Sequence, residues 1–222
     1  DLGSGGFVET SSKLNLQAFG SVDATGGLSN GLWLLDPSNV TITNAQANGA
    51  FNSGTPNVFT PSDDTATVNA SDIKSSIDNN VSVTIFTRND AGSEAGDIVI
   101  DSNASDLASL NNTATTTFTL IAAGAIGIND EITASTNPVN IVLRAQGNIS
   151  VTETIRTEGG SFTVTGSNTA GDDSLGFSTS AGSFTLSSSK SINTKPQPAN
   201  EGVVGGAISI STISRGGTTG NI

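Results

Sequence analysis

The sequence predicts an all-β fold, namely a parallel β-helix (a solenoid) that forms a single domain over residues 1–222. Three observations predict it. Apolar residues recur at a spacing of 23 positions in the second half, they alternate with small polar residues inside each copy, and glycine, asparagine, aspartate and serine interrupt the copies. At about 22 residues per coil, the chain would make roughly ten coils.

The repeat is clearest between residues 118 and 158. The stretch FTLIAAGAIGINDEITAS from Phe118 aligns with IVLRAQGNISVTETIRTE from Ile141. The matched apolar pairs, each 23 residues apart, are Leu120 with Leu143, Ile126 with Ile149, Ile128 with Val151, and Ile132 with Ile155. Looser copies follow at Phe162 and Val164, at Phe184 and Leu186, and at Ile208 and Ile210.

Alternation within each copy predicts strands, as in SFTVT (161–165) and NISVT (148–152). Period two puts successive side chains on opposite faces, so one face of each strand can be buried. A unit of this length must stack on its neighbours to bury that face. Leu120 would then rest on Leu143 at about 4.8 Å. The side chains expected to point inward and stack are Ile126, Ile128, Ile149 and Val151.

The first half is less regular. Strands are expected at 13–19, 39–43, 81–86 and 96–101, where apolar and polar residues alternate. Residues 44–70 are rich in Asn, Thr, Gly and Pro, which predicts an irregular loop excursion, and a second one is expected at 195–206. One short helix is expected at 71–77, with Ser71 as its N-cap and Asp72 near its positive end.

Composition narrows the classes of function. The chain has no cysteine and no histidine, which excludes disulfides, thiolate chemistry and nucleophiles activated by histidine. The net charge is −12, with only 8 Lys and Arg, so no basic face is expected for a nucleic acid or an anionic membrane. No apolar run approaches the roughly 20 residues of a membrane helix, so no membrane insertion is expected.

The chain begins at Asp1 and contains no methionine. We therefore expect a processed product or a piece of a longer protein. The sequence leaves open whether it is a fragment or a mature polymerising subunit, and it does not give the length of the parent protein.

Several motifs in residues 5–100 resemble one known family. They are GGFVETS (Gly5–Ser11), WLLDP (Trp33–Pro37), VTI (Val40–Ile42), and SDIKSSIDNNVSVTI from Ser71. The pattern resembles the filamentous-haemagglutinin and high-molecular-weight adhesin family of two-partner-secreted exoproteins. The remainder of the chain is similar to that family only in its style of repeat.

The resemblance implies a right-handed β-helical fibre that is extracellular or on the cell surface, in a Gram-negative bacterium, and that mediates adhesion. The implied partner is a receptor or glycan on a host or neighbouring cell. The sequence gives neither the identity of this partner nor the organism that the chain comes from. The resemblance also implies that Pro37 sets a turn before strand 40–42 and that Trp33 fills a corner of the core. We expect Trp33 to be a core residue and not a platform for sugar stacking.

Candidate catalytic carboxylates lack partners. Glu9, Asp23 and Asp36 have no histidine or cysteine to work with. The repeat places Asp130 level with Glu153, with Arg156 three positions further on, and a solvated outer face is the favoured interpretation of this group.

One stretch of the sequence is a candidate for binding calcium. Asp172 and Asp173 lie in a Gly-rich stretch that could hold calcium, but the repeated Gly-Gly-x-Gly-x-Asp pattern is missing. We therefore expect no catalytic residue, cofactor or metal.

Six Asn-x-Ser/Thr sequons are present and are possible glycosylation sites. They begin at Asn39, Asn69, Asn80, Asn103, Asn111 and Asn148. Chance accounts for some of them in a chain so rich in Asn and Thr. The resemblance favours the loop positions Asn69 and Asn103.

The expected function is that of a non-enzymatic adhesin or surface-fibre segment. One alternative is a self-assembling filament subunit that stacks end to end as a homopolymer, because open strand edges pair readily. The other alternative is a polysaccharide-active enzyme on a β-helix, which would need converging carboxylates.

Overall fold

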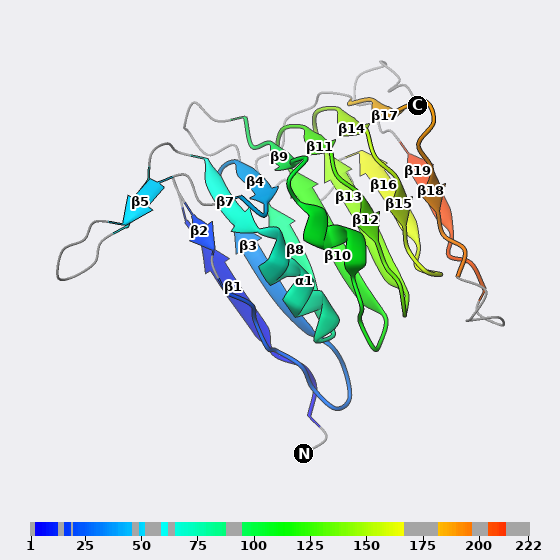
Figure 1. The fold of residues 1–222 in the computed structure, drawn as a ribbon, viewed down its shortest axis with the longest axis horizontal. Coiled ribbons are helices and arrows are strands. Elements are labelled where there is room, and N and C mark those ends of the chain that lie inside the picture. Colours follow the sequence, from blue (N-terminus) through cyan, green and yellow to red (C-terminus); the bar gives the residue numbers. More distant parts are fainter. Residues whose placement is uncertain are drawn as a thin grey trace.

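A computed structural model describes residues 3–12, 16–18, 20–45, 49–51, 59–61, 65–87, 95–166, 182–196 and 204–211. Within these residues the chain passes repeatedly through two large parallel sheets and a third, smaller layer (Figure 1). We name them sheet I, sheet II and the third layer. No helix in these residues is long and apolar enough to cross a membrane.

Sheet I has seven strands, all parallel. Its order is β1 (Phe7–Ser11), β3 (Gly31–Asp36), β8 (Val81–Phe86), β10 (Thr116–Ala122), β13 (Val139–Ala145), β16 (Phe162–Gly166) and β19 (Ile208–Ser211). Its inner strands alternate buried and half-buried residues, as the sequence pattern predicts. In this sheet the spatial order of the strands follows their order in the chain.

Sheet II also has seven parallel strands, which are shorter. Its order is β17 (Phe184–Leu186), β14 (Ile149–Val151), β11 (Ile126–Ile128), β9 (Ile98–Ile100), β4 (Val40–Thr43), β7 (Ala66–Asn69) and β2 (Gln17–Ala18). The order departs from the chain order at β7, which lies between β4 and β2.

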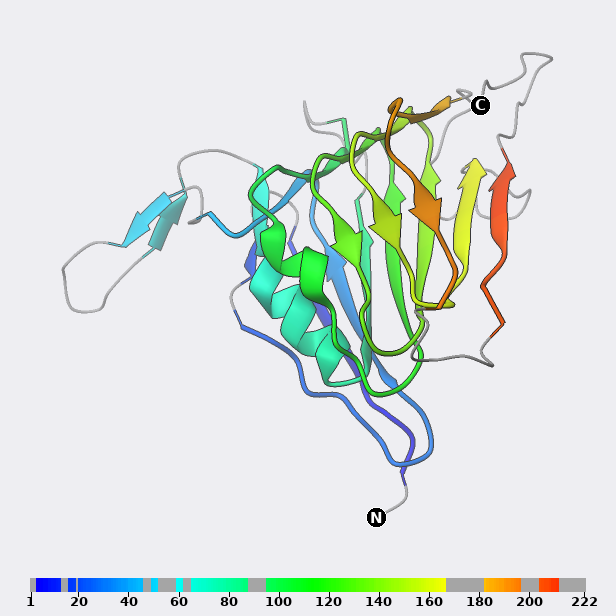
Figure 2. The ribbon, with the colours of Figure 1, turned by 45° about the vertical axis from the view of Figure 1, so that its right-hand side comes forward.

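The third layer is helical in its first part and a small sheet in its second. It contains α1 (Ala70–Asp78), the 3₁₀ helix η1 (Ser105–Ser109) and the strands β12 (Ile132–Thr133), β15 (Ile155–Arg156) and β18 (Ile192–Asn193). The antiparallel hairpin of β5 (Gly49–Phe51) and β6 (Phe59–Pro61) projects away from these layers (Figure 2).

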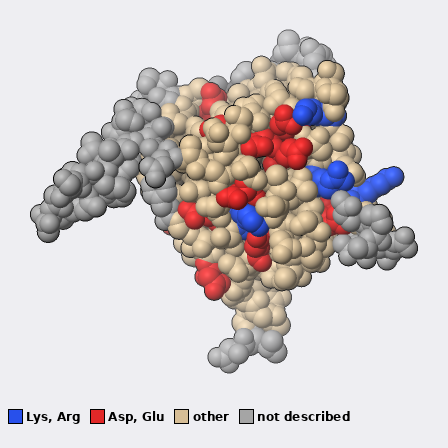
Figure 3. Space-filling view, in the orientation of Figure 1, with Lys and Arg blue, Asp and Glu red and all other residues tan. Residues whose placement is uncertain are grey.

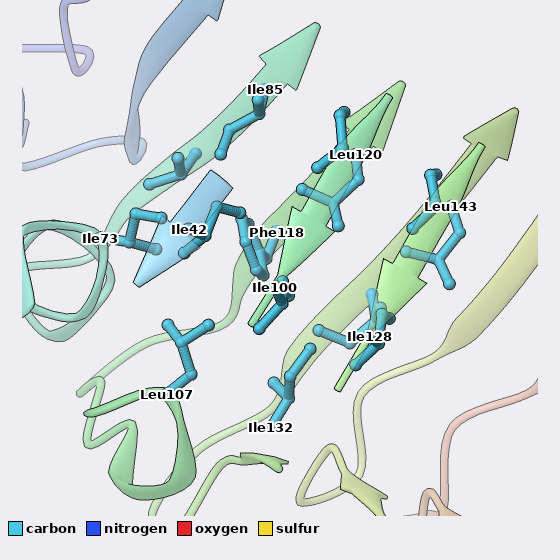
Figure 4. Close-up of a cluster of buried hydrophobic side chains, with 14 of the residues drawn as sticks. Ile42, Ile73, Ile85, Ile100, Leu107, Phe118, Leu120, Ile128, Ile132 and Leu143 are labelled. Carbon is cyan, nitrogen blue, oxygen red and sulfur yellow. The ribbon is translucent and has the colours of Figure 1, made fainter. Parts of the chain in front are cut away.

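The core lies where the three layers face one another. Figure 4 shows Ile85, Leu120 and Leu143 side by side on adjacent strands of sheet I, opposite Ile42, Ile100 and Ile128 of sheet II. The third layer contributes Ile73, Leu107 and Ile132 to the same core (Figure 4). All nine side chains are buried. Their contact with like residues one strand away supplies the main stabilising free energy of the fold.

The predicted 23-residue register is confirmed. Leu120 pairs with Leu143, Ile126 with Ile149, Ile128 with Val151, and Ile132 with Ile155. The four residues expected to point inward, Ile126, Ile128, Ile149 and Val151, are all buried. Matched apolar pairs at one spacing therefore gave the correct strand partners.

The predicted fold class is wrong. The described residues form an α/β-type arrangement of parallel sheets in layers, and not an all-β right-handed parallel β-helix of roughly ten coils. The third layer starts as helix because Ala70, Ile73 and Ile77 recur at helical spacing and bury one face. Each large sheet has seven strands, and the position of β7 breaks the regular succession that a solenoid requires.

Three local predictions also need correction. The helix begins at Ala70, and its N-cap is Asn69, whose Oδ1 accepts from the Ser71 N–H at 3.0 Å. Residues 66–69, expected in a loop, form the buried strand β7. Phe184, expected to continue the series of Phe162, instead pairs with Ile149 in sheet II, and the strand that follows Phe162 in sheet I contributes Ile208.

Parts of the predicted irregular segments and of the first predicted strand lie outside the described residues. These parts are 13–15, 19, 46–48, 52–58, 62–64 and 197–203.

Candidate functional site

Charged side chains gather on the face formed by α1, η1 and the strands of the third layer (Figure 3). Several of these carboxylates accept hydrogen bonds that hold neighbouring segments in place. Asp72 Oδ2 accepts from the Gly20 N–H at 2.6 Å, and Asp78 Oδ1 accepts from the Asn111 N–H at 2.6 Å. Asp78 also pairs with Lys74 one helical turn earlier. Asp72 and Asp78 therefore bind two different loops to the helix, and their carboxylates do not share a binding partner.

The candidate pair of Asp130 and Glu153 lies at the edge of this face. The two residues are level with each other, because Ile132 pairs with Ile155 two positions further on. Glu153 Oε2, however, lies 2.5 Å from the Nζ of Lys190, which occupies the same level in the turn before β18, and Asp130 Oδ1 accepts from the Glu131 N–H. Lys190 therefore pairs with Glu153. The arrangement is a surface ion pair between the turns that precede β15 and β18.

Trp33 is a core residue, as predicted. Its side chain is 2% exposed, in the middle of β3 and not at a corner, where its neighbours in the sheet are Val8 and Val83. The indole N–H donates to the Thr10 hydroxyl at 3.2 Å. A buried ring with its only polar atom hydrogen-bonded offers no face to a sugar.

The three acids near the start of the chain do not form a catalytic group. Glu9 is exposed on β1, and Asp36, at the end of β3, pairs with Ser11, two positions along from Glu9. Asp23 lies outside these strands, where the Thr25 hydroxyl donates to its Oδ1 at 2.7 Å and the Thr25 N–H at 3.2 Å. These two bonds hold the pKa of Asp23 below its usual value, so this carboxyl is poorly suited to act as a base.

Three sequon asparagines occupy corners between layers, a role that the sequence analysis missed. Asn39 Oδ1 accepts from the N–H groups of Gly96 and Asp97 at 2.8 and 2.7 Å. Asn80 Oδ1 accepts in the same way from the N–H groups of Thr113 and Ala114, in the following pass of the chain. Asn148 Oδ1 accepts from the N–H and the hydroxyl of Ser183. The sequence signal that could have indicated this role is an Asn directly before a strand that begins with an inward apolar residue and an outward Ser or Thr.

The other three sequons differ in exposure. Asn69 caps α1 and is half-buried, and Asn111 is exposed, with its Oδ1 accepting from the Thr136 hydroxyl. Asn103 is exposed in the turn before η1. Exposure in a turn suits a modified asparagine best at Asn103. Modification of any of the six remains a prediction.

The side chains that commonly bind metal ions are dispersed in the part of the chain that the structure describes. There, no group of three or more His, Cys, Asp or Glu side chains is placed to hold a metal ion. The calcium candidates Asp172 and Asp173 lie outside the described residues.

The remaining candidate is the pair of edges of sheet I. Within the described ranges, β1 and β19 end this sheet, and each is paired on one side only. Both carry exposed apolar side chains, Phe7 and Val8 on β1 and Ile208 on β19. An exposed, apolar strand edge is a surface on which another strand can pair.

Comparison with known proteins adds no assignment. No protein-family model matches the chain, and no curated protein is significantly similar to it. The expectations of an adhesin of the filamentous-haemagglutinin family and of two-partner secretion therefore gain no support from these comparisons.

Proposed function

We propose that this chain is a non-enzymatic structural segment of an extracellular or cell-surface fibre, of the kind found in adhesins. The observation that carries the proposal is a continuous buried column across sheet I. The column contains Trp33, Val83, Phe118, Ile141 and Phe162, each paired with the next. Each strand buries the apolar side chains of the strand before it, and this favours an extended, load-bearing body.

The polar groups of the described residues are consistent with this proposal. Asn39, Asn80 and Asn148 bind backbone donors of a later pass of the chain, and Glu153 pairs with Lys190 between successive turns. Such groups stabilise the stacking of strands, whereas a polysaccharide hydrolase needs two carboxylates free to act on one glycosidic bond. The extracellular location is supported by the resemblance of the motifs in residues 5–100 to large exoproteins. The partner on a host or neighbouring cell is a receptor or glycan of unspecified identity.

A second candidate, a filament subunit that stacks end to end, is favoured by the exposed edges of sheet I. It is compatible with the first, because a structural segment extends a fibre whether its neighbour is covalently linked or not.

Turnover of polysaccharides tests the proposal. The purified chain is incubated with acidic and neutral polysaccharides, and the release of reducing ends and unsaturated sugars is measured over time. We expect no turnover, because Asp72, Asp78 and Glu153 form hydrogen bonds or ion pairs that hold neighbouring segments in place. The matched variants are Asp130→Asn and Glu153→Gln. Turnover in the parent chain that disappears in either variant would show that the protein is an enzyme.

A further inference from the structure

The two edge strands of sheet I are complementary to each other. In a parallel sheet each strand directs alternate peptide groups to each neighbour. Among the described residues, β1 and β19 therefore each leave one row of N–H and C=O groups without a strand partner. The two strands lie at opposite edges of the same sheet and run in the same direction (Figure 1). The free edge of β19 can therefore continue into the free edge of β1 of another copy without a change of direction.

Burial is lost only at the ends of the apolar column. The column begins with Val8, which pairs with Trp33, and ends with Ile208, which pairs with Phe162. The five side chains between them are at most 2% exposed, whereas Val8 is 37% and Ile208 is 51% exposed. A second column runs beside it from Thr10 through Leu35 to Ile210, and its two end residues are half-buried.

We propose that a second copy of this chain covers these edges, with β19 of one copy paired in parallel with β1 of the next. Ile208 then lies beside Val8 and Ile210 beside Thr10, so that both columns continue across the junction. This inference rests on the proposed function as a fibre segment and names the partner of its exposed edges.

The chemistry of the two strands suits this register. Ser209 faces outward beside Thr163, and the same outward row leads back to Glu9 through Leu34. At the junction Ser209 therefore meets Glu9, and its hydroxyl can donate to the carboxylate. No pair of like charges is brought together along the four matched positions, which are Val8 with Ile208, Glu9 with Ser209, Thr10 with Ile210, and Ser11 with Ser211.

The symmetry of the contact determines the assembly. It joins two different edges, so it is a head-to-tail contact that does not close and that generates a filament. Seven strands of sheet I at about 4.8 Å each give a spacing of roughly 34 Å per copy along the filament. Affinity would come from main-chain hydrogen bonds, with the side-chain columns fixing the register.

Sedimentation velocity over a wide range of concentrations tests the pairing. We expect the parent chain to form species that grow with concentration. Val8→Lys and Ile208→Glu should each shift the protein to the monomer, because a charge then faces an apolar edge. Mixing the two variants should restore association, because one supplies an intact β19, the other an intact β1, and the altered edges carry opposite charges.

Matched controls separate this effect from a general change of charge. Leu28→Lys and Val204→Glu add the same charges at apolar residues that are 68% and 85% exposed but lie outside the edge strands, and they should leave association unchanged. Circular dichroism checks that all four variants remain folded.

A parent chain that stays monomeric at every concentration overturns the pairing, as does loss of association in only one of the two edge variants. Either result leaves the non-enzymatic proposal intact, because that proposal depends on polysaccharide turnover and not on association.

Discussion

Asparagine side chains at the starts of strands link successive passes of the chain. Asn80 is the clearest case, because its Oδ1 accepts from two backbone N–H groups and its Nδ2 donates to the Thr113 hydroxyl at 2.7 Å. Its φ of 63° lies in the left-handed region, which Asn tolerates better than most residues. The residue that follows, Val81, is fully buried. The sequence Asn-Val-Ser at this corner is therefore explained by a turn followed by an inward and an outward residue.

Replacing Asn80 tests this structural role. Asn80→Ala removes the acceptor and places a Cβ-bearing, non-polar residue at positive φ, so we expect a loss of about 2 kcal/mol of unfolding free energy. Asn80→Gly restores the conformational freedom without the hydrogen bonds and should cost about 1 kcal/mol. Urea denaturation measures both. Asn103→Ala, at an exposed sequon, is the control and should change stability by less than about 0.5 kcal/mol. Equal losses at Asn80 and Asn103 would contradict the proposed role.

At the level of the elements, the strands of the repeat were predictable and their placement was only partly so. Phe162 and Phe184 each open a short stretch of the same SFT pattern, yet they belong to sheet I and sheet II respectively. Alternation specifies which face of a strand is buried, but it does not say which sheet receives the strand. The same limit applies to β7, where Ala66 and Val68 are fully buried beside β4 although the surrounding sequence resembles a loop.

The strand β14, which lies between β11 and β17 in sheet II, provides a direct test of the inward stacking. Val151 is fully buried between Ile128 and Leu186. Val151→Asp would bury a charge without a partner, and we expect it to lower the unfolding free energy by several kcal/mol. Ser150→Asp, at the next position on the opposite face of the strand, is the matched control and should have a small effect. Thermal melting of both variants distinguishes the two faces, and a Val151→Asp protein that melts like the parent would contradict the assignment.

For the molecule as a whole, the sequence predicted the partners of strands but not the fold class. Leu120 and Leu143 are neighbours because matched apolar residues favour stacking, and this signal is local to the repeat. The helical part of the third layer is different, because Ile73 and Leu107 occupy the core position that Ile132 fills further along. The 23-residue spacing alone does not reveal that helices take the place of strands in the first part of the third layer. For the candidate site, the leucines on both sides of Trp33 predicted that it is in the core, whereas the role of the corner asparagines depends on donors in a later pass of the chain.

Mechanical unfolding follows from the same arrangement. In sheet I each strand pairs only with its immediate neighbours, so tension applied through the ends should detach strands one at a time. Successive strands of sheet I are offset by 21 residues at the least, from β13 to β16, and by 50 at the most, from β3 to β8. The steps should therefore release roughly 70 to 170 Å of chain, at roughly 3.4 Å per residue. Optical-trap recordings should show a series of such steps. A single cooperative event that releases the whole length would contradict this expectation.

A crosslinked variant gives the corresponding control, and the chain suits it because it has no cysteine of its own. Val142 and Thr163 are paired outward residues of β13 and β16, so Val142→Cys with Thr163→Cys places two thiols at neighbouring positions across the ladder. Once oxidised, the variant encloses the 21 residues from one cysteine to the other, and these can no longer be extended. One step should disappear from the recordings and return on reduction. Stepwise extension that is identical in the oxidised and reduced proteins would show that the steps do not arise from the separation of β13 and β16.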